Sequence, residues 1–343
     1  MNLSPLVDEV KLQAYLAAHL GGAAEPVHAL KIQAGHSNET FLVSRGEQRW
    51  VLRRPPRGPL LPTAHDVLRE FRVMSALFGA GFPVPRPILA CEDSEVIGAP
   101  FYLMERVDGV VIRNSLAAEV ATAADRAAIA EQLIRTLVAL HAVDYAGAGL
   151  GNLGRPDGYI ARQIKRWMGQ LDSARSRPLP DLDAVSVWLQ RSLPDSPPAT
   201  IVHGDFRLDN VIYATHLPAR LMAVLDWEMS TLGDPLADLG YLLSFWREHG
   251  EPSATPLPDD MGDVTSLPGF PTRAALAARY EELSGRRMTH LTFYVVLAIW
   301  KLAILLEGSY NRHLAGTTDD PFFALLGEGV PALARRARAL SGV

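Results

Sequence analysis

Three oxygen-bearing side chains in one part of the sequence have the types and the spacing for metal-assisted chemistry on a hydroxyl group. Asp205 follows the apolar pair Ile201-Val202 and the dipeptide His203-Gly204, and Asn210 stands five residues after it. Asp226 comes 21 residues after Asp205, at the end of another apolar run. A carboxylate can accept a hydroxyl proton, and carboxylate and carboxamide oxygens are hard ligands that suit Mg²⁺. We therefore expect Asp205 to be a general base, and Asn210 and Asp226 to be magnesium ligands.

A short β-hairpin would bring Asp226 back to the loop that carries Asp205. The runs Val211–Tyr213 and Leu221–Leu225 are apolar and can pair as its two strands. Each piece alone is weak, because an isolated His-Gly-Asp is usually a turn and an aspartate at a strand end is usually a cap. Together they match the H-x-D-x-x-x-x-N loop and the later metal aspartate of kinases, which indicates phosphoryl transfer from ATP.

The residues before about 110 predict a strand-rich part with one capped helix. Thr63 and Asp66 form a T-x-x-D capping box after a proline-rich turn. The apolar residues that follow recur at helical spacing: Val67, Phe71, Met74 and Leu77. Another helix is expected near Val7 to Leu20. Strands are expected around Val27–Ile32, Thr40–Ser44, Arg49–Arg53, Ile88–Cys91 and Pro100–Met104.

A kinase-like site needs a cation on its third strand that pairs with a carboxylate on the following helix. Trp50-Val51-Leu52-Arg53 stands where kinases have V-A-I-K, so Arg53 replaces the usual lysine. The arginine fork can grip phosphate oxygens. Arg54 competes for the role, but strand alternation sends it to the opposite face. Glu70, on the capped helix, is the expected partner of Arg53, and a solvated Glu70 is the alternative.

The loop expected to cover the nucleotide phosphates is a weaker signal. Residues 34–39 contain one glycine rather than a G-x-G-x-x-G motif. Ser37 and Asn38 could donate hydrogen bonds from backbone and side chain to phosphate oxygens. On its own this stretch would be interpreted as a turn.

The strand that ends near residue 105 is expected to be the hinge that holds the adenine base. Met104 would contribute to an apolar wall, together with residues near Ile212 and Leu225. Backbone groups of Glu105 and Val107 would bond the adenine edge. The alternative is an ordinary interior strand.

The remainder of the chain has helical periodicity, interrupted by one β-rich island from Thr200 to Trp227. Helices are expected at about 121–142, 158–175, 182–193, 236–247, 272–284, 288–311 and 320–340. This order predicts an α+β, bilobal, protein-kinase-like fold, with a nucleotide-binding lobe at 1–106 and a catalytic and substrate-binding lobe at 107–343. The proline- and glycine-rich segment 250–271 is either a surface insertion or a lid over the substrate.

The strings around these motifs resemble a known family. His203–Asn210, Asp226-Trp227-Glu228 and the run from Gly233 to Leu239 are similar to the aminoglycoside phosphotransferase and choline kinase-like family. They are most similar to the branch that occurs as the kinase-like domain of acyl-CoA dehydrogenase family members 10 and 11. The resemblance covers about residues 25–330. It implies a kinase-like fold, ATP and Mg²⁺ as cofactors, and a small-molecule alcohol as acceptor.

The resemblance also suggests roles for residues near the catalytic loop. Arg207, two residues after the base, stands where kinases have a lysine near the γ-phosphate, and would stabilise transition-state charge or form a structural ion pair. Asp238 matches an aspartate that supports the loop backbone from the next helix. His203 is expected to pack and to hydrogen-bond rather than to act as an acid or base. Glu228 lies either near the metals or at the surface.

Composition excludes several other classes. The 343 residues carry 33 basic and 38 acidic side chains, a net charge of −5, which gives no electrostatic basis for nucleic-acid or membrane partners. One cysteine, Cys91, permits no internal disulfide and suits a cytoplasmic protein. The N-terminus lacks a signal-peptide pattern. The apolar stretch Phe293–Leu306, interrupted by Lys301, is too short to span a bilayer and is expected to be a core helix.

The acceptor is not determined by these motifs, and two classes of alcohol stay open. The resemblance favours a hydroxyacyl-CoA or hydroxy acid, for which the basic run Arg162, Lys165 and Arg166 could meet phosphates. An aminoglycoside is the alternative, since the acidic residues Asp259, Asp260 and Asp263 could bind a polycation.

A nucleotide-binding pseudokinase that acts as a scaffold is the hypothesis from another functional class. The presence of Asp205, Asn210 and Asp226 argues against it, and Arg53 is the one departure that favours it. A homodimer is compatible with the sequence.

Overall fold

The structure is a computed structural model. It describes residues 6–22, 25–32, 38–57, 65–113, 115–116, 122–215, 219–252, 262–316 and 322–343. The chain divides into two compact units, of which the first comprises Met1–Asp108 and Met222–Glu228, and the second comprises Gly109–Leu221 and Met229–Val343. The division lies two residues after the predicted boundary. The inclusion of 222–228 in the first unit was not predicted from the sequence.

An antiparallel sheet of five strands is the framework of the first unit. Its order is β1-β2-β3-β5-β4, so β5 lies between β3 and β4. The register pairs Arg53 of β3 with Tyr102 of β5 and with Thr40 of β2. The strands are β1 (Val27–Ile32), β2 (Glu39–Arg45), β3 (Gln48–Arg54), β4 (Pro87–Cys91) and β5 (Phe101–Glu105).

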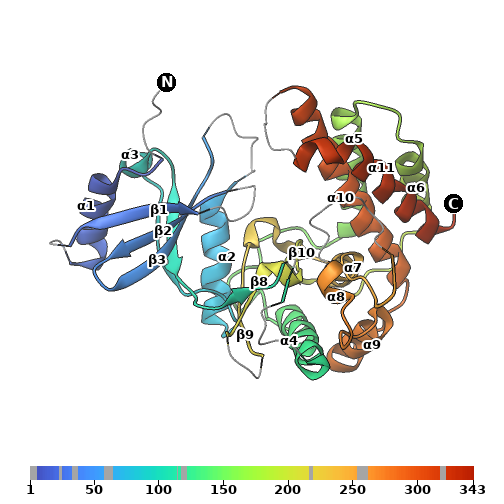
Figure 1. Ribbon diagram of the computed structural model, residues 1–343, viewed down its shortest axis with the longest axis horizontal. Coiled ribbons are helices and arrows are strands. Elements are labelled where there is room, and N and C mark those ends of the chain that lie inside the picture. The colour runs from blue at the N-terminus through green and yellow to red at the C-terminus, as the bar shows by residue number, and fades with distance from the viewer. Residues whose placement is uncertain are drawn as a thin grey trace. The chain divides into compact units, whose positions relative to one another are not determined.

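One face of this sheet carries an apolar core beneath helix α1 (Glu9–Leu20) (Figure 1). Leu12 and Leu16 of α1 are fully buried against Trp50 and Leu52 of β3. Asp8 caps the helix by accepting hydrogen bonds from the backbone of its first turn. The short helix α3 (Ser94–Ile97), which was not predicted, adds Ile97 to the same core.

Helix α2 (Val67–Gly79) covers the opposite face of the sheet (Figure 1). Its N-cap is Asp66, whose side chain accepts the Arg69 amide, while the predicted partner Thr63 lies outside the described residues. Val67, Met74 and Leu77 of the predicted apolar stripe are buried, and the half-buried Phe71 contacts the ring of Tyr102 of β5. Glu70 takes the inward position, because it meets a buried cation on the sheet rather than solvent.

The segment 222–228 packs against the turn that follows α2. The Val224 amide donates to the Pro83 carbonyl at 2.8 Å, and the indole of Trp227 contacts the Phe82 ring edge-to-face. These contacts explain why this stretch belongs to the first unit despite its distance in sequence.

The second unit is mostly helical, as predicted, and the α+β class is confirmed. Its long helices agree with the predicted ranges to within a few residues. They are α4 (Ala123–His141), α5 (Tyr159–Ala174), α6 (Pro180–Arg191), α7 (Leu236–Ser244), α9 (Arg273–Ser284), α10 (Leu291–Leu314) and α11 (Phe322–Ser341), with the short α8 (Gly262–Thr265) between α7 and α9.

Short strands support the loop that carries Asp205. β7 (Thr200–Val202) leads into that loop and pairs antiparallel with β10 (Thr231–Gly233). β6 (Val110–Val111) pairs with β8 (Val211–Tyr213). The predicted hairpin follows, since the Ala214 amide donates to the Arg220 carbonyl and β9 (Leu221–Val224) begins there.

Helix α10 is the central helix of the second unit and packs against α5, α7 and α11. Among the described residues it is the one helix that is long and apolar enough to cross a membrane. More than half of its most apolar segment is buried in the protein. The expectation that its apolar stretch is too short to span a bilayer was wrong, because the helix meets that requirement in length and composition. The expected burial in a protein core is observed, since Trp300 and Ile304 are fully buried.

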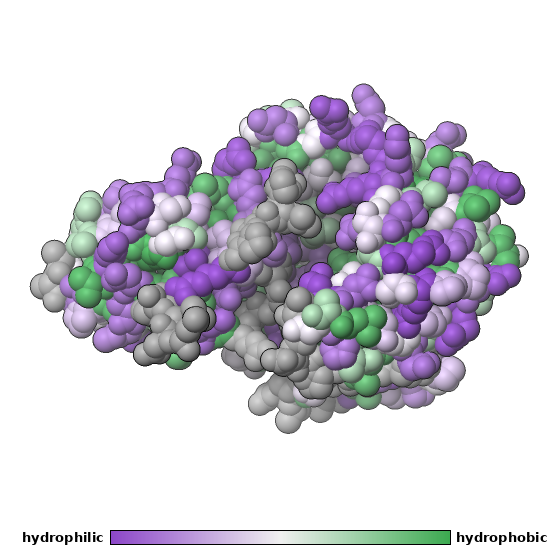
Figure 2. Space-filling view, turned by 90° about the horizontal axis from the view of Figure 1, so that it is seen from above, coloured by the Kyte–Doolittle hydropathy of each residue, from purple (hydrophilic) through white to green (hydrophobic). Residues whose placement is uncertain are grey.

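Hydrophilic side chains predominate on the face drawn in Figure 2, with hydrophobic ones scattered among them. The exposed large hydrophobic residues of the described chain come from several elements, including α1, β1, α6 and α11.

The close approach of α7 to α10 generates a stability prediction. A Cβ atom at Gly240 would lie 2.6 Å from the Tyr294 backbone, closer than real Cβ contacts. We expect Gly240→Ala to lower the free energy of unfolding by about 1–3 kcal/mol in urea titrations, because the two helices must separate. Gly169→Ala is the matched control, since nothing lies within 4 Å of its added Cβ. It should be neutral or stabilising by up to about 1 kcal/mol. Equal effects of the two substitutions would contradict the packing argument.

Candidate active site

A buried ion pair joins the sheet and helix α2 of the first unit. The Nη1 atom of Arg53 lies 2.5 Å from Oε1 of Glu70, and both side chains are almost fully buried. Burial raises the pKa of Glu70 to about 7, whereas the Arg53 guanidinium and the Tyr102 hydroxyl act against that rise by stabilising the carboxylate. Burial alone would lower the pKa of Arg53, but the Glu70 charge outweighs it and the net shift is upward. The predicted Arg53–Glu70 contact is therefore present.

Asp226 lies close to this pair within the same unit. Its Oδ1 atom is 3.5 Å from Nη1 of Arg53. Asp226 has a φ of 65°, in the left-handed region that non-glycine residues seldom adopt. Such backbone strain is often concentrated at functional sites. Its carboxylate is about 29 % exposed, so one face of this acidic group stays open to a ligand.

Arg54 points away from this cluster, as strand alternation predicts. Its guanidinium donates to the carbonyls of Leu6 and Ile97 on the α1 side of the sheet, and it is 3 % exposed. The Arg54 guanidinium therefore hydrogen-bonds to backbone carbonyls of the first unit.

Asn38 is buried and its side chain is engaged at both ends. Its Nδ2 donates to Oε2 of Glu228 at 3.1 Å, and its Oδ1 lies 3.1 Å from Nδ1 of His65. Glu228 also accepts a bond from Arg69 through its backbone carbonyl. Glu228 is thus an anchoring residue of the first unit, half-buried rather than at the surface. Ser37 lies outside the described residues.

The hinge candidates lie at the end of β5. Met104 is buried, Glu105 is exposed, and Val107 is half-buried. The Glu105 amide already donates to the Arg86 carbonyl at 2.8 Å. A bond from Glu105 to adenine would consequently have to use its carbonyl oxygen.

In the second unit, the loop after β7 is held by one buried carboxylate. Asp238, fully buried on α7, accepts the His203 amide at 2.7 Å through Oδ2 and the Gly204 amide at 2.8 Å through Oδ1. The Asp205 amide in turn donates to Nδ1 of His203 at 3.2 Å. Asp238 and His203 therefore support the loop as predicted, because the side chain of each accepts hydrogen bonds from backbone amides of the loop.

A second layer fixes Asp238 itself. His141 of α4 lies 3.3 Å from Oδ2 of Asp238 through Nε2, and 2.6 Å from the Tyr280 hydroxyl through Nδ1. Burial lowers the pKa of His141. Burial also acts to raise the pKa of Asp238, but the bonds from His141 and the Gly204 amide outweigh it and hold that pKa below its usual value. A neutral His141 that donates from Nε2 to Asp238 and accepts the Tyr280 hydroxyl at Nδ1 gives both ring nitrogens a hydrogen-bond partner.

Three side chains surround the Asp205 carboxylate. Asn210 donates from Nδ2 to Oδ2 of Asp205 at 2.8 Å and also to its backbone carbonyl. Arg207 places Nε 3.1 Å from Oδ1 of Asp205 and Nη2 3.1 Å from Asp209, and its guanidinium lies over the Phe245 ring. The Tyr241 hydroxyl bonds the same carboxylate, and burial together with the Asp205 charge raises the pKa of Tyr241 well above its usual value.

The donor atoms fit a hard divalent cation, although no cluster of three or more His, Cys, Asp or Glu side chains occurs in the described part of the chain. Asn210 uses its Nδ2 to hold Asp205, which leaves its Oδ1 oxygen for a ligand. Asp226 offers a partly exposed carboxylate. Carboxamide and carboxylate oxygens are the ligand types that Mg²⁺ takes. Asn210 belongs to the second unit and Asp226 to the first.

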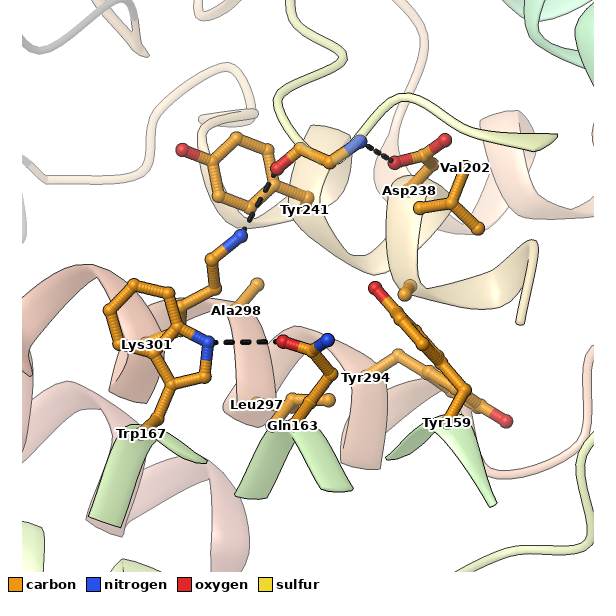
Figure 3. A pocket seen from close by; sticks show the side chains of 12 residues that line it. Tyr159, Gln163, Trp167, Val202, Asp238, Tyr241, Tyr294, Leu297, Ala298 and Lys301 are labelled. Carbon is orange, nitrogen blue, oxygen red and sulfur yellow. Dashed lines mark hydrogen bonds between the residues drawn. The ribbon is translucent and has the colours of Figure 1, made fainter. Parts of the chain in front are cut away.

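Sequence reasoning missed a group of residues behind the catalytic loop. Lys301 of α10 donates to the Gly204 carbonyl at 3.2 Å, and its ammonium lies between the rings of Trp167 and Tyr241 (Figure 3). These residues border a cavity of about 30 Å³ in the second unit, room for about two water molecules. The one available signal was the position of Lys301 within the apolar stretch Phe293–Leu306.

The chain is similar to known proteins over most of its length. A family model described as the phosphotransferase enzyme family matches residues 28–259. Acyl-CoA dehydrogenase family member 11 of Rattus norvegicus is 38% identical over 339 residues, which cover 96% of this chain and 43% of that protein. Acyl-CoA dehydrogenase family member 10 of Mus musculus is 37% identical, over 89% of this chain and 28% of that protein. The chain thus spans less than half the length of these curated relatives.

Solved structures give the same result. A putative aminoglycoside phosphotransferase from Ralstonia eutropha JMP134 has a TM-score of 0.82 and 33% identity, with 98% of each chain covered. A spectinomycin phosphotransferase in complex with ADP and spectinomycin has a TM-score of 0.63 and 10% identity, covering 97% of this chain and 99% of that one, which shows the shared fold. The extent of these matches, and the kinase-like motifs within them, establish that the chain belongs to the phosphotransferase enzyme family.

Proposed function

We propose that this protein is an ATP-dependent small-molecule kinase that transfers the γ-phosphoryl group to an alcohol, with Asp205 as the general base. The observation that carries the proposal is the Asp205 carboxylate, held by Asn210 on a loop whose backbone Asp238 fixes. Pre-organised geometry of this kind is what phosphoryl transfer requires from a protein.

In the proposed reaction, Asp205 accepts the proton of the acceptor hydroxyl while that oxygen bonds to the γ-phosphorus. The bond from phosphorus to the bridging oxygen breaks, and ADP leaves. Asn210 and Asp226 would hold Mg²⁺, which when bound neutralises charge on the phosphate oxygens. Arg207, next to Asp205, would add positive charge near the transferring group.

For the nucleotide, we propose that Arg53 binds phosphate oxygens while Glu70 holds it in place. Met104, Glu105 and Val107 would contact adenine, and Ser37 and Asn38 would lie near the phosphates. Because the Asn38 side chain is engaged by Glu228 and His65, its contribution would come from its backbone. The ADP complex of the spectinomycin phosphotransferase, which shares this fold, supports the binding of a nucleotide.

For the acceptor, we propose a hydroxyacyl-CoA or a hydroxy acid. This choice is supported by the names of the relatives, which are acyl-CoA dehydrogenase family members 11 and 10. The aminoglycoside alternative is supported by the names of the structural neighbours. Of the acidic residues that could bind a polycation, Asp263 is paired with Arg247, and Asp259 and Asp260 lie outside the described residues. A pseudokinase scaffold is disfavoured by the intact Asp205, Asn210 and Asp226.

The reaction can be tested with an acceptor panel. ADP formation from ATP and Mg²⁺ is measured with hydroxyacyl-CoAs, free hydroxy acids, choline, sugars and aminoglycosides. We expect one acceptor class to stimulate turnover, and Asp205→Ala to lower that rate by about 10²- to 10⁴-fold, because it removes the general base. Magnesium-dependent nucleotide binding without turnover on any acceptor would support the scaffold instead. Turnover that survives Asp205→Ala would contradict the assigned base.

The nucleotide end can be tested at Arg53. We expect Arg53→Met to lower the free energy of unfolding by about 3–5 kcal/mol, because Glu70 is left buried without its counter-charge. Binding of ADP with Mg²⁺, measured by calorimetry, should weaken as well, while Arg53→Lys should keep most of both properties. Arg49→Met is the matched control, an exposed arginine of the same strand. If Arg49→Met and Arg53→Met bind ADP equally well, Arg53 has no role in nucleotide binding.

A further inference from the structure

We infer that Lys301 is a positioning residue of the phosphoryl-transfer site, which holds the Gly204 carbonyl and thereby fixes the backbone from which Asp205 projects. The inference rests on the proposed function, because it takes Asp205 as the base. Lys301 lies 97 residues from Gly204 in sequence, yet its Nζ atom is 3.2 Å from the Gly204 oxygen (Figure 3).

The backbone at Gly204 needs such support. Its φ is 86°, in the left-handed region, and an added Cβ would lie 2.8 Å from the Met229 carbonyl oxygen. Glycine tolerates this conformation, but it loses the most conformational freedom when it is fixed. Asp238 binds the Gly204 amide and Lys301 binds its carbonyl. Two side chains of opposite charge, from α7 and α10, thus hold the two polar groups of one residue.

Lys301 is itself confined by two aromatic rings. Its ammonium lies 5.5 Å from the centroid of the Trp167 ring and 5.3 Å from that of Tyr241. Each ring face attracts a cation at this range. Burial lowers the pKa of Lys301, whereas the charges of Asp205 and Asp238 favour the ammonium form.

The setting explains why a lysine rather than an apolar residue stands here. The flanking part of α10 is apolar and buried, with Trp300 and Ala303 fully covered. A methionine would fill the same space without the cost of desolvating a charge. Lys301 provides what an apolar side chain cannot, a charged donor to the Gly204 carbonyl.

Tyr241 gives Lys301 a second connection to the base. The Tyr241 hydroxyl bonds the Asp205 carboxylate, while its ring faces the Lys301 ammonium. Loss of the cation would therefore loosen two supports of Asp205, the Gly204 peptide and the Tyr241 ring.

The test replaces Lys301 by methionine, which keeps the length and removes the charge. Lys301→Arg is the conservative variant, and Lys11→Met makes the same substitution at an exposed lysine of α1. Magnesium-dependent ADP formation is measured with ATP and with water as the acceptor. For Lys301→Met we expect kcat to fall about 10- to 100-fold, because the base is misplaced. The KM for ATP should stay unchanged, Lys301→Arg should recover part of kcat, and Lys11→Met should behave as the wild type.

A spectroscopic measurement reports on the backbone without turnover. The sequence contains two His–Gly pairs, His203–Gly204 and His249–Gly250. Labelling with carbonyl-¹³C histidine and ¹⁵N glycine therefore selects two amide signals in an NMR experiment. In Lys301→Met we expect the Gly204 amide to shift and to exchange faster with solvent. The Gly250 amide serves as the internal control and should not change.

The outcomes separate this inference from the proposed function. Turnover that persists in Asp205→Ala would overturn the assignment of Asp205 as the base, which is the part of the proposed function on which this inference rests. Turnover that is lost in Asp205→Ala but unchanged in Lys301→Met would overturn the positioning role alone. An unaltered Gly204 amide in Lys301→Met would overturn it as well, even if turnover with water is too slow to measure. Equal loss of kcat and thermal stability in Lys301→Met and Lys301→Arg would assign Lys301 to folding, against the inference.

Discussion

The second unit depends on one buried carboxylate whose oxygens bind backbone rather than ligand. Asp238 accepts the amides of His203 and Gly204 immediately before Asp205. A fully buried charge is unfavourable unless every lone pair finds a donor, and His141 supplies a further one. The network of Asp238, His141 and Tyr280 therefore joins α4, α7 and α9 to the loop. Its geometry resists deformation because any movement would leave a buried polar group without a partner.

The first unit uses charge in a different way. The Arg53 guanidinium forms ion pairs with two carboxylates, the buried Glu70 and the more exposed Asp226. The buried carboxylate fixes the arginine, and the exposed one stays accessible. An arginine suits this task, because its planar fork presents several donors in fixed directions. The departure from the usual lysine is thus compatible with the same local arrangement.

Local patterns predicted most of the fold, and they failed where contacts span long distances in sequence. Helical spacing located α2 and α10, and strand alternation separated the directions of Arg53 and Arg54. The inward position of Glu70 could be inferred only with the kinase motif, since burial of a lone glutamate contradicts its ordinary preference. Lys301 and Tyr241 were not found, because periodicity predicts which face of a helix is buried but not which distant loop that face meets. The membership of 222–228 in the first unit was missed for the same reason, since it depends on Phe82 and Pro83.

That discontinuity has a consequence for how such a chain can be cut and recombined. The polypeptide passes between the units at 108–109, at 221–222 and again at 228–229. A fragment that ends near residue 108 would lack the stretch that contacts Phe82 and Pro83, and with it Asp226. A single crossover that falls between residues 70 and 226 of related genes would likewise join one parent's Arg53 and Glu70 to the other parent's Asp226. An exchange of the first unit as a whole must therefore transfer residues 222–228 together with residues 1–108.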